Sequence, residues 1–290
     1  MRLSKGVQYI LLATLLFAFM NVLVKQVDRI PAVEVVLFRS AISLVICLVS
    51  LRAKKVSVWG HNKPILIARG AFGATSLVLF FITLQNIPLA RATVLHYVAP
   101  IFTAIIAAVF LSERLRWWQL LFFLVSFTGV FFIKNFDDEI PLLYFSTGVI
   151  SAFFAGCAYN CIRKLKTTEH PLVIVFYFPL VTLPIVSIAS FFFWVTPQGV
   201  EWLYLLGIGL LTQLAQVYMT KAYQTEMAAR VAGTSYIGLL YALGLGFVFF
   251  EETFTWQVLT GMLLVVTGVI LNLFFKNEPA MKEKVSKIKS

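Results

Sequence analysis

Apolar stretches of about 20 residues recur along the whole chain, separated by short polar joins such as QVDRIP, SERLR and TPQGVE. This is roughly the length with which an α-helix crosses the hydrocarbon core of a bilayer. The joins leave no room for a separate soluble domain, so we expect an all-α polytopic membrane protein. The pattern predicts ten transmembrane helices, at about 6–26, 32–52, 64–85, 90–111, 116–134, 142–163, 170–194, 202–223, 228–250 and 254–276.

Composition supports a chain whose main partner is the lipid bilayer. Hydrophobic residues make up 60% of the 290 positions, charged residues 13%, and the mean hydropathy is +0.89. Soluble proteins carry about 25% charged residues. The net charge of +11 resides mostly in short loops and in the tail KEKVSKIKS, which argues against a nucleic-acid partner. The first apolar run is too long for a signal peptide, and we interpret it as the first transmembrane helix.

The second half of the chain repeats the first. A shift of 139 positions aligns 90–131 with 229–270 without a gap, and 12 of the 42 aligned positions are identical. One register across both halves indicates an internal duplication. We therefore expect a first five-helix repeat over 1–139, a second over 140–276, and a basic cytoplasmic tail over 277–290. The same shift aligns Asn21 with Asn160, Lys25 with Lys164, Gly70 with Gly209, Arg91 with Arg230, Tyr97 with Tyr236 and Glu113 with Glu252.

The placement of Lys and Arg predicts the orientation. Eighteen of them fall on the side of the predicted helices that holds both termini, four fall on the opposite side, and two lie within helices. By the positive-inside rule, both termini are expected in the cytoplasm. The protein is expected to be a multi-pass protein of the inner or plasma membrane. Because each repeat has five helices, the second repeat is expected to be inverted, and inverted repeats are typical of transporters. A duplicated scaffold without transport is the alternative.

Several motifs carry a resemblance to a known family. They are FAFMNVLVK, LFRSAISL, RGAFGATSLVLFF, IPLARATVLHYVAPIFTAIIAAVFLSERL and the two TGV triplets. In this order and spacing they resemble the drug/metabolite transporter superfamily, with two EamA-like repeats from about residue 6 to 275. The resemblance implies a ten-helix carrier with a central cavity, and the RGxxG sequence resembles the branch of S-adenosylmethionine and organic-anion carriers. The repeats differ at three positions: Leu239 replaces Pro100, Phe178 replaces Arg39 and Ile208 replaces Arg69.

Two arginines within predicted helices are candidate substrate-binding residues. An ionisable group inside a bilayer costs about 2.5–3.5 kcal/mol on insertion scales, so a functional role is the default hypothesis. The guanidinium of Arg39 could bind a carboxylate in bidentate geometry, or it could be a structural group bonded to helix-end carbonyls or to Glu34. Arg69 lies one turn inside its helix and could instead extend to the cytoplasmic surface.

The fourth and ninth predicted helices supply further candidates. His96 could relay a proton or donate a hydrogen bond to substrate, or its ring could be satisfied by a neighbouring carbonyl. Tyr97 and Tyr236 are the duplicated aromatic pair, and Ser235 matches His96. In the resembled family these helices line the cavity, which implies an aromatic clamp on the substrate, with simple packing as the alternative. Pro100 is expected to kink the fourth helix.

Polar residues on three other predicted helices complete the candidate set. Gln213 and Gln216 share one face of the eighth helix and, with Tyr218, are expected to line a cavity. Asn21 and Asn160 are matching amides that could contact substrate or join helices by hydrogen bonds.

The sequence therefore predicts a secondary transporter of a small polar organic metabolite, working by alternating access. The intramembrane arginines and the lack of midspan acids favour a carboxylate-bearing solute such as an amino acid, S-adenosylmethionine or an organic acid. No enzyme motif, cofactor site or metal site is expected, although an integral-membrane enzyme and a channel remain alternatives. The protein is expected to be a monomer or a homodimer.

Overall fold

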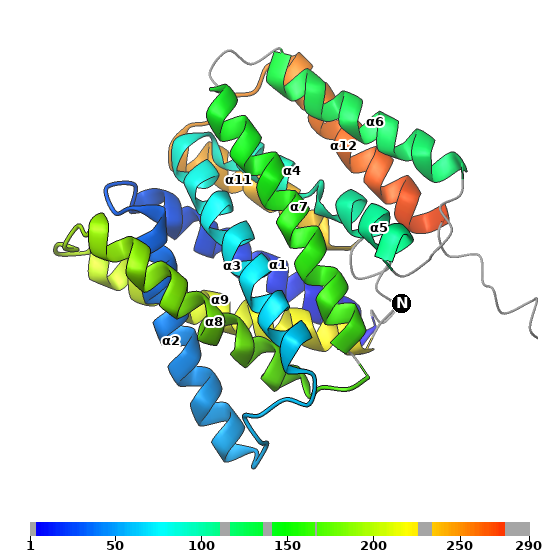
Figure 1. Cartoon of the computed structure of the whole chain (residues 1–290). Coiled ribbons are helices and arrows are strands. Elements are labelled where there is room, and N and C mark those ends of the chain that lie inside the picture. The colour runs from blue at the N-terminus through cyan, green and yellow to red at the C-terminus, as the bar shows by residue number, and fades with distance from the viewer. Residues whose placement is uncertain (1–3, 111–116, 136–140, 166, 226–233, 276–290) are drawn as a thin grey trace, which may run out of the picture.

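The computed structural model describes residues 4–110, 117–135, 141–165, 167–225 and 234–275, and the regular structure within these ranges is α-helical (Figure 1). The helices of the first half are α1 (Lys5–Gln26), α2 (Ala32–Ala53), α3 (Lys63–Asn86), α4 (Leu89–His96), α5 (Ala99–Phe110) and α6 (Trp117–Asn135). Those of the second half are α7 (Leu142–Leu165), α8 (Pro171–Phe192), α9 (Glu201–Thr225), α11 (Ile237–Phe250) and α12 (Trp256–Phe275).

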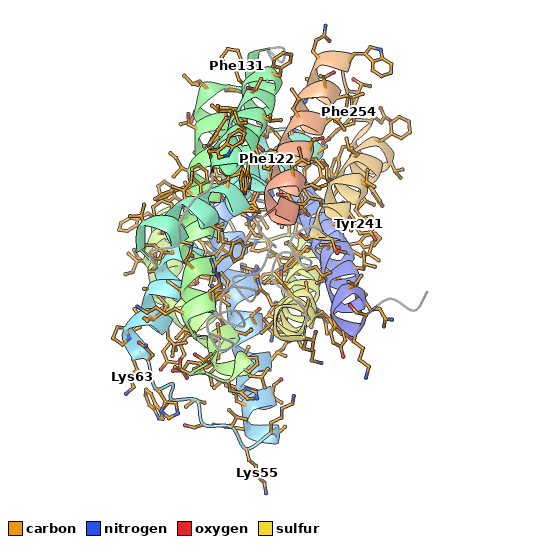
Figure 2. The ribbon with its side chains drawn as sticks, turned by 90° about the vertical axis from the view of Figure 1, so that its right-hand side faces the viewer. Lys55, Lys63, Phe122, Phe131, Tyr241 and Phe254 are labelled. Carbon is orange, nitrogen blue, oxygen red and sulfur yellow. The ribbon has the colours of Figure 1, made fainter. Side chains whose placement is uncertain are left out.

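The helices agree closely with the hydrophobic pattern. Within the ranges just given, seven segments are long and apolar enough to cross a membrane, and shorter apolar helices cover Leu121–Phe132, Ile237–Phe250 and Trp256–Gly268. Lys55 and Lys63 lie at one end of the molecule, and Phe131 and Phe254 at the opposite end (Figure 2). The chain is therefore a multi-pass membrane protein with a polar connection between α2 and α3 at one end.

The segment predicted at 90–111 is long and apolar enough to cross a membrane over Leu89–Ala107, but it consists of two helices, α4 and α5, instead of one. The break falls at Tyr97 and Val98, directly before Pro100. Proline has no N–H, and its ring clashes with the carbonyl four residues earlier, here that of His96. Proline is tolerated in the first turn of a new helix, which is where Pro100 lies in α5. The expected kink is thus a complete interruption of the helix.

The second half has a break at the equivalent place. Residues 234 and 235 are helical, Tyr236 is a turn residue, and α11 starts at Ile237. Proline does not cause this break, because Leu239 stands where the first half has Pro100. The predicted helix at 228–250 is therefore also interrupted, and its first residues, 228–233, lie outside the described part of the chain.

The helices of the two halves are interleaved, and the halves do not form two separate bundles. Each principal helix pair joins one helix from each half: α1 with α9, α3 with α7, α2 with α8, and α6 with α12 (Figure 1). Under the 139-residue shift, α1 is the equivalent of α7 and α3 is the equivalent of α9. The α1–α9 pair in one arrangement is therefore matched by the α7–α3 pair in the other. In each of the other two pairs the two helices are equivalents of each other, α2 of α8 and α6 of α12. This is the contact pattern of a two-fold axis relating the halves.

Close glycine contacts repeat with the same spacing. A Cβ added to Gly70 would lie 2.6 Å from the Cβ of Val181, and one added to Gly209 would lie 2.8 Å from the Cβ of Ile42. Val181 and Ile42 are themselves 139 positions apart. The α3–α8 and α2–α9 contacts are therefore built in the same way, each with a glycine that lets the helices approach closely.

Residues that match each other in the two repeats also meet directly. The Arg39 guanidinium lies 5.2 Å from the centre of the Phe178 ring, the rings of Tyr97 and Tyr236 are 4.9 Å apart, and Ser126 donates a hydrogen bond to the carbonyl of Val265 at 3.3 Å. A residue can touch its own equivalent only near the axis that relates the repeats. These three meetings lie at the α2–α8 contact, beside α4 and α11, and at the α6–α12 contact.

Candidate functional site

The two tyrosines at the helix breaks complete each other's backbone hydrogen bonding. The Tyr97 hydroxyl donates to the carbonyl of Ser235 at 2.8 Å, and the Tyr236 hydroxyl donates to the carbonyl of Tyr97 at 2.9 Å. A helix break frees carbonyls that the apolar interior of a membrane protein must satisfy internally. Each tyrosine therefore stabilises the break in the other half. The pair predicted to clamp a substrate is brought together, but both hydroxyls are occupied by the protein.

A small cavity lies beside the tyrosine pair, between α1, α4 and α11. Its volume is about 30 Å³, and its polar lining comes from Thr14, Asn21, Thr93 and Tyr97. One water needs about 10–15 Å³, so one or two waters fit and a metabolite does not. The Asn21 side chain is buried, and its carbonyl oxygen accepts no hydrogen bond from the described residues. Asn21 is therefore an available acceptor beside the tyrosine pair.

Arg39 is buried between the halves. Its Nε donates to the hydroxyl of Thr212 on α9 at 3.0 Å, and its guanidinium lies over the rings of Phe178 and Phe81. The alternative partner Glu34 instead accepts a hydrogen bond from the backbone N–H of Val195 at 2.9 Å. Among the described residues no ion pair reaches Arg39. Its contacts are thus a hydroxyl and two aromatic faces.

Arg69 shares one of these aromatic faces. Its guanidinium lies 4.5 Å from the centre of the Phe178 ring, and the side chain is 5% exposed. The interpretation that Arg69 extends to the surface is therefore wrong. Gly73, one turn along α3, makes room for it, because an added Cβ would lie 2.5 Å from the Arg69 guanidinium. The structure brings the two predicted arginines together at Phe178.

His96 ends α4 and faces α3 and α7. Its Nδ1 lies 3.3 Å from the hydroxyl of Ser151, and its ring is 4.5 Å from that of Phe80. Ser151 also donates to the carbonyl of Ser76 at 2.9 Å. The imidazole is therefore held by a hydroxyl rather than by the carbonyl considered from the sequence, and it lies one residue from the helix break.

The remaining predicted residues are divided among separate helix contacts. Asn160 donates to the carbonyls of Thr103 and Gly156, which makes it a link between α7 and α5. Gln213 donates to the sulfur of Cys47 on α2 at 3.1 Å. Gln216 is partly buried, whereas Tyr218 packs 5.9 Å from Tyr9 on α1. Ser235 contributes its carbonyl to the tyrosine pair. The predicted cluster on the eighth helix is thus not one site.

Sequence reasoning missed a buried carboxylate, that of Glu252. It accepts hydrogen bonds from the backbone N–H groups of Leu89 and Ala90 at the start of α4, and it lies 3.7 Å from Lys25 Nζ. Lys25 also donates to the carbonyl of Ile87 at 2.7 Å. This Lys25–Glu252 latch joins α1, α4 and the end of α11. The available signal was the duplication, since both residues have an identical partner in the other repeat.

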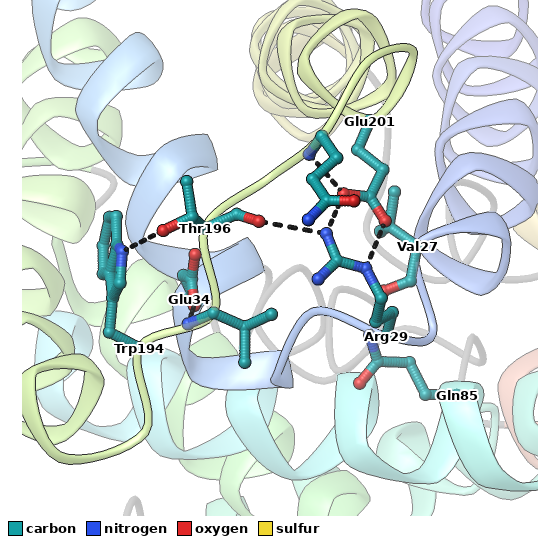
Figure 3. A network of polar contacts seen from close by, with 9 residues as sticks. Val27, Arg29, Glu34, Gln85, Trp194, Thr196 and Glu201 are labelled. Atoms are coloured by element: carbon teal, nitrogen blue, oxygen red, sulfur yellow. Dashed lines mark hydrogen bonds and ion pairs between the residues drawn. The ribbon is translucent and has the colours of Figure 1, made fainter.

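A second, exposed polar network lies near the α1–α2 connection. Arg29 Nε donates to Glu201 at 2.9 Å, and the guanidinium also donates to the carbonyl of Thr196 at 3.0 Å (Figure 3). The hydrogen bond to Glu201 raises the pKa of Arg29 above its ordinary value. This network ties the α1–α2 connection to the start of α9, a few residues after Lys25 in the last turn of α1.

Similarity to known proteins extends over almost the whole chain. The family described as EamA-like transporter family matches residues 4–134 and again residues 142–274. The chain is 35% identical over 273 residues to the pseudopaline exporter CntI of Pseudomonas aeruginosa, covering 92% of this chain and 95% of that protein. It is 30% identical to human solute carrier family 35 member G1, covering 91% and 77%.

More distant similarities agree with these matches. The chain is 26% identical to the S-adenosylmethionine uptake transporter of Rickettsia felis, covering 96% of this chain and 95% of that protein. A solved crystal structure superposes with a TM-score of 0.69 at 17% identity, covering 96% of this chain and all of the other. At that identity the superposition shows the fold alone.

Proposed function

Because the chain belongs to the EamA-like transporter family, we propose that it is a secondary transporter that moves a small polar organic metabolite by alternating access. Family membership confirms the resemblance to the drug/metabolite transporter superfamily, and it makes the protein a transporter rather than an enzyme. The observation that carries the proposal is the family match to both halves. Two relatives, an exporter of pseudopaline and an uptake transporter of S-adenosylmethionine, support a metabolite as the substrate.

The proposed topology is ten membrane segments arranged as two inverted repeats, over 1–139 and 140–276. The reciprocal pairing of α1 with α9 and of α7 with α3 supports a two-fold relation between the repeats. Five segments in each repeat invert the second, and the excess of Lys and Arg on one side supports cytoplasmic termini in the inner or plasma membrane. In such a transporter the substrate site lies where the repeats meet, near the middle of the membrane.

The arrangement of the site supports alternating access. The cavity beside Asn21 and Tyr97 is too small for a metabolite, and the Lys25–Glu252 latch closes one end of the contact between α1 and α4. The helix breaks at Tyr97 and Tyr236 are places where α4 and α11 can bend. We therefore assign the cavity between these helices to a closed state, which a substrate opens by separating α1 from α4 and α11.

Counterflow in liposomes tests the function. The purified chain is first screened for thermal stabilisation by amino acids, S-adenosylmethionine and organic acids, because a ligand that binds only the folded state stabilises it by about 2.7 kcal/mol at a hundredfold excess over its Kd. Each hit is then loaded into proteoliposomes, and uptake of the labelled compound against its gradient is followed. A transporter gives a transient overshoot. Binding without counterflow in any loaded vesicle would favour a non-transporting scaffold, and flux without saturation would favour a channel.

A further inference from the structure

Two guanidinium groups share one aromatic ring in the interior of the protein. Those of Arg39 and Arg69 lie 5.2 and 4.5 Å from the centre of the Phe178 ring, and the side chains are 3% and 5% exposed. Both come from the first half of the chain, whereas Phe178 belongs to α8 in the second half. Two positive charges are thus concentrated at one buried point between the halves.

The protein places no negative charge beside them. In the described ranges the ion pairs are Lys25 with Glu252 and Arg29 with Glu201, and neither involves Arg39 or Arg69. A terminal guanidinium nitrogen of Arg39 and the Nε of Arg69 also donate to no acceptor in these ranges. Arginine stays protonated in proteins, so it cannot escape this cost by losing its proton. Aromatic faces reduce the cost of a buried cation but leave its N–H donors unpaired.

The pair lies where α2 and α3 of the first half meet α8 of the second half. Phe178 is the equivalent of Arg39 in the other repeat, and the two touch at the axis that relates the repeats. The equivalent of Arg69 is Ile208, so the second repeat supplies no matching charge. The Thr212 hydroxyl on α9 accepts from the Arg39 Nε, and one terminal nitrogen of the guanidinium has no acceptor among the described residues. An anion at this point would neutralise charges from one half while contacting both.

We propose that Arg39 and Arg69 form a carboxylate-binding subsite in the interior of the transporter, with Phe178 and Thr212 fixing the orientation of the two guanidinium groups. The planar fork of arginine donates two parallel hydrogen bonds to a carboxylate. This inference rests on the proposed function, because it names the substrate class as metabolites that bear a carboxylate.

Thermal stability of the purified full chain tests the subsite. Succinate is compared with its neutral dimethyl ester and with inorganic phosphate, with chloride keeping the ionic strength equal. Succinate is expected to raise the Tm of the wild type above the chloride reference, and the ester is not. R39Q and R69Q are expected to weaken the apparent affinity for succinate about 10- to 100-fold, since each removes charged hydrogen bonds. R39K, which keeps the charge without the fork, is expected to lose less.

R52Q is the matched control, because Arg52 lies at the exposed end of α2 and should leave the succinate response unchanged. If the glutamine variants do not fold, T212V replaces them, since it removes only the hydroxyl that holds Arg39 and should weaken succinate binding more than R52Q does. The proposal is overturned if succinate and its ester act alike on the wild type, if only phosphate stabilises, or if R39Q, R69Q and R52Q respond equally.

Failure of the subsite is distinguishable from failure of the transport function. Counterflow of a metabolite without a carboxylate, with no stabilisation by succinate, would leave the transporter intact and overturn the subsite. Succinate binding that depends on Arg39 and Arg69, together with no counterflow of any compound, would support the subsite and refute transport.

Discussion

Replacement of Glu252 by glutamine should lower the free energy that holds the start of α4 in place, and the contacts of Glu252 give the size of this loss. The carboxylate accepts from the N–H groups of Leu89 and Ala90 and lies 3.7 Å from Lys25 Nζ. Hydrogen bonds to charged groups contribute about 1.5–3 kcal/mol and neutral ones about 0.5–1.5, so the two bonds lose about 1 kcal/mol each. The ion pair adds up to about 1 kcal/mol, because Lys25 is partly exposed. The total is about 2–3 kcal/mol.

This free energy should appear as faster amide exchange. A loss of about 2–3 kcal/mol is a 30- to 150-fold change in an opening equilibrium, since 1.4 kcal/mol is about tenfold. Hydrogen–deuterium exchange of the peptide that contains Leu89 and Ala90 should therefore accelerate by about that factor in E252Q. Local opening of a native protein is what such exchange measures.

The neighbouring acid provides the control for this experiment. Glu251 is exposed and adopts a left-handed backbone conformation with φ of 52°. E251Q removes the same charge one residue away without touching the latch, so its exchange at Leu89 and Ala90 should match the wild type. Equal exchange rates in E252Q and E251Q would refute the reasoning, because the carboxylate would then not hold the start of α4.

Three further predictions follow from the contacts between the halves. Gly70→Ala and Gly209→Ala should each destabilise the protein by about 1–3 kcal/mol through overpacking, which thermal unfolding would measure. Gly244→Ala is the control, because a Cβ at Gly244 meets nothing within 4 Å, and it should not lower the Tm. Equal Tm values for all three variants would contradict this prediction. Tyr97→Phe and Tyr236→Phe should each cost about 1 kcal/mol by leaving a carbonyl at a helix break without its donor, and unchanged urea-induced unfolding would refute that role. Reporter tags on both termini should be accessible only from the cytoplasm, and labelling of either from outside would overturn the proposed orientation.

Much of the fold follows from the sequence because apolar length and helix length coincide in a membrane. The break at Pro100 was also foreseeable, since proline has a known effect on the helix that precedes it. The break at Tyr236 was not, because Leu239 gives no such signal. Its cause lies in the other half of the chain, where Tyr97 supplies a donor for the freed carbonyl of Ser235.

The candidate site was predictable in its chemistry but not in its grouping. Arg39 and Arg69 stood out because charges are rare within apolar helices, yet their meeting at Phe178 depends on how α2 and α3 pack against α8. The role of Glu252 was hidden for a related reason. Its partners lie 162 residues or more away in the sequence, and a residue at the end of a helix gives no indication of which other helix ends surround it.

The interleaving of the halves has a consequence for how the protein is made. Synthesis proceeds from the N-terminus, so α1 and α3 enter the membrane before their main packing partners, α9 and α7, have been translated. Until α8 arrives, Arg39 and Arg69 also lack the ring that covers them. The first repeat is therefore an assembly intermediate that depends on the insertion machinery, and a message truncated after it should yield a degraded fragment rather than half a transporter.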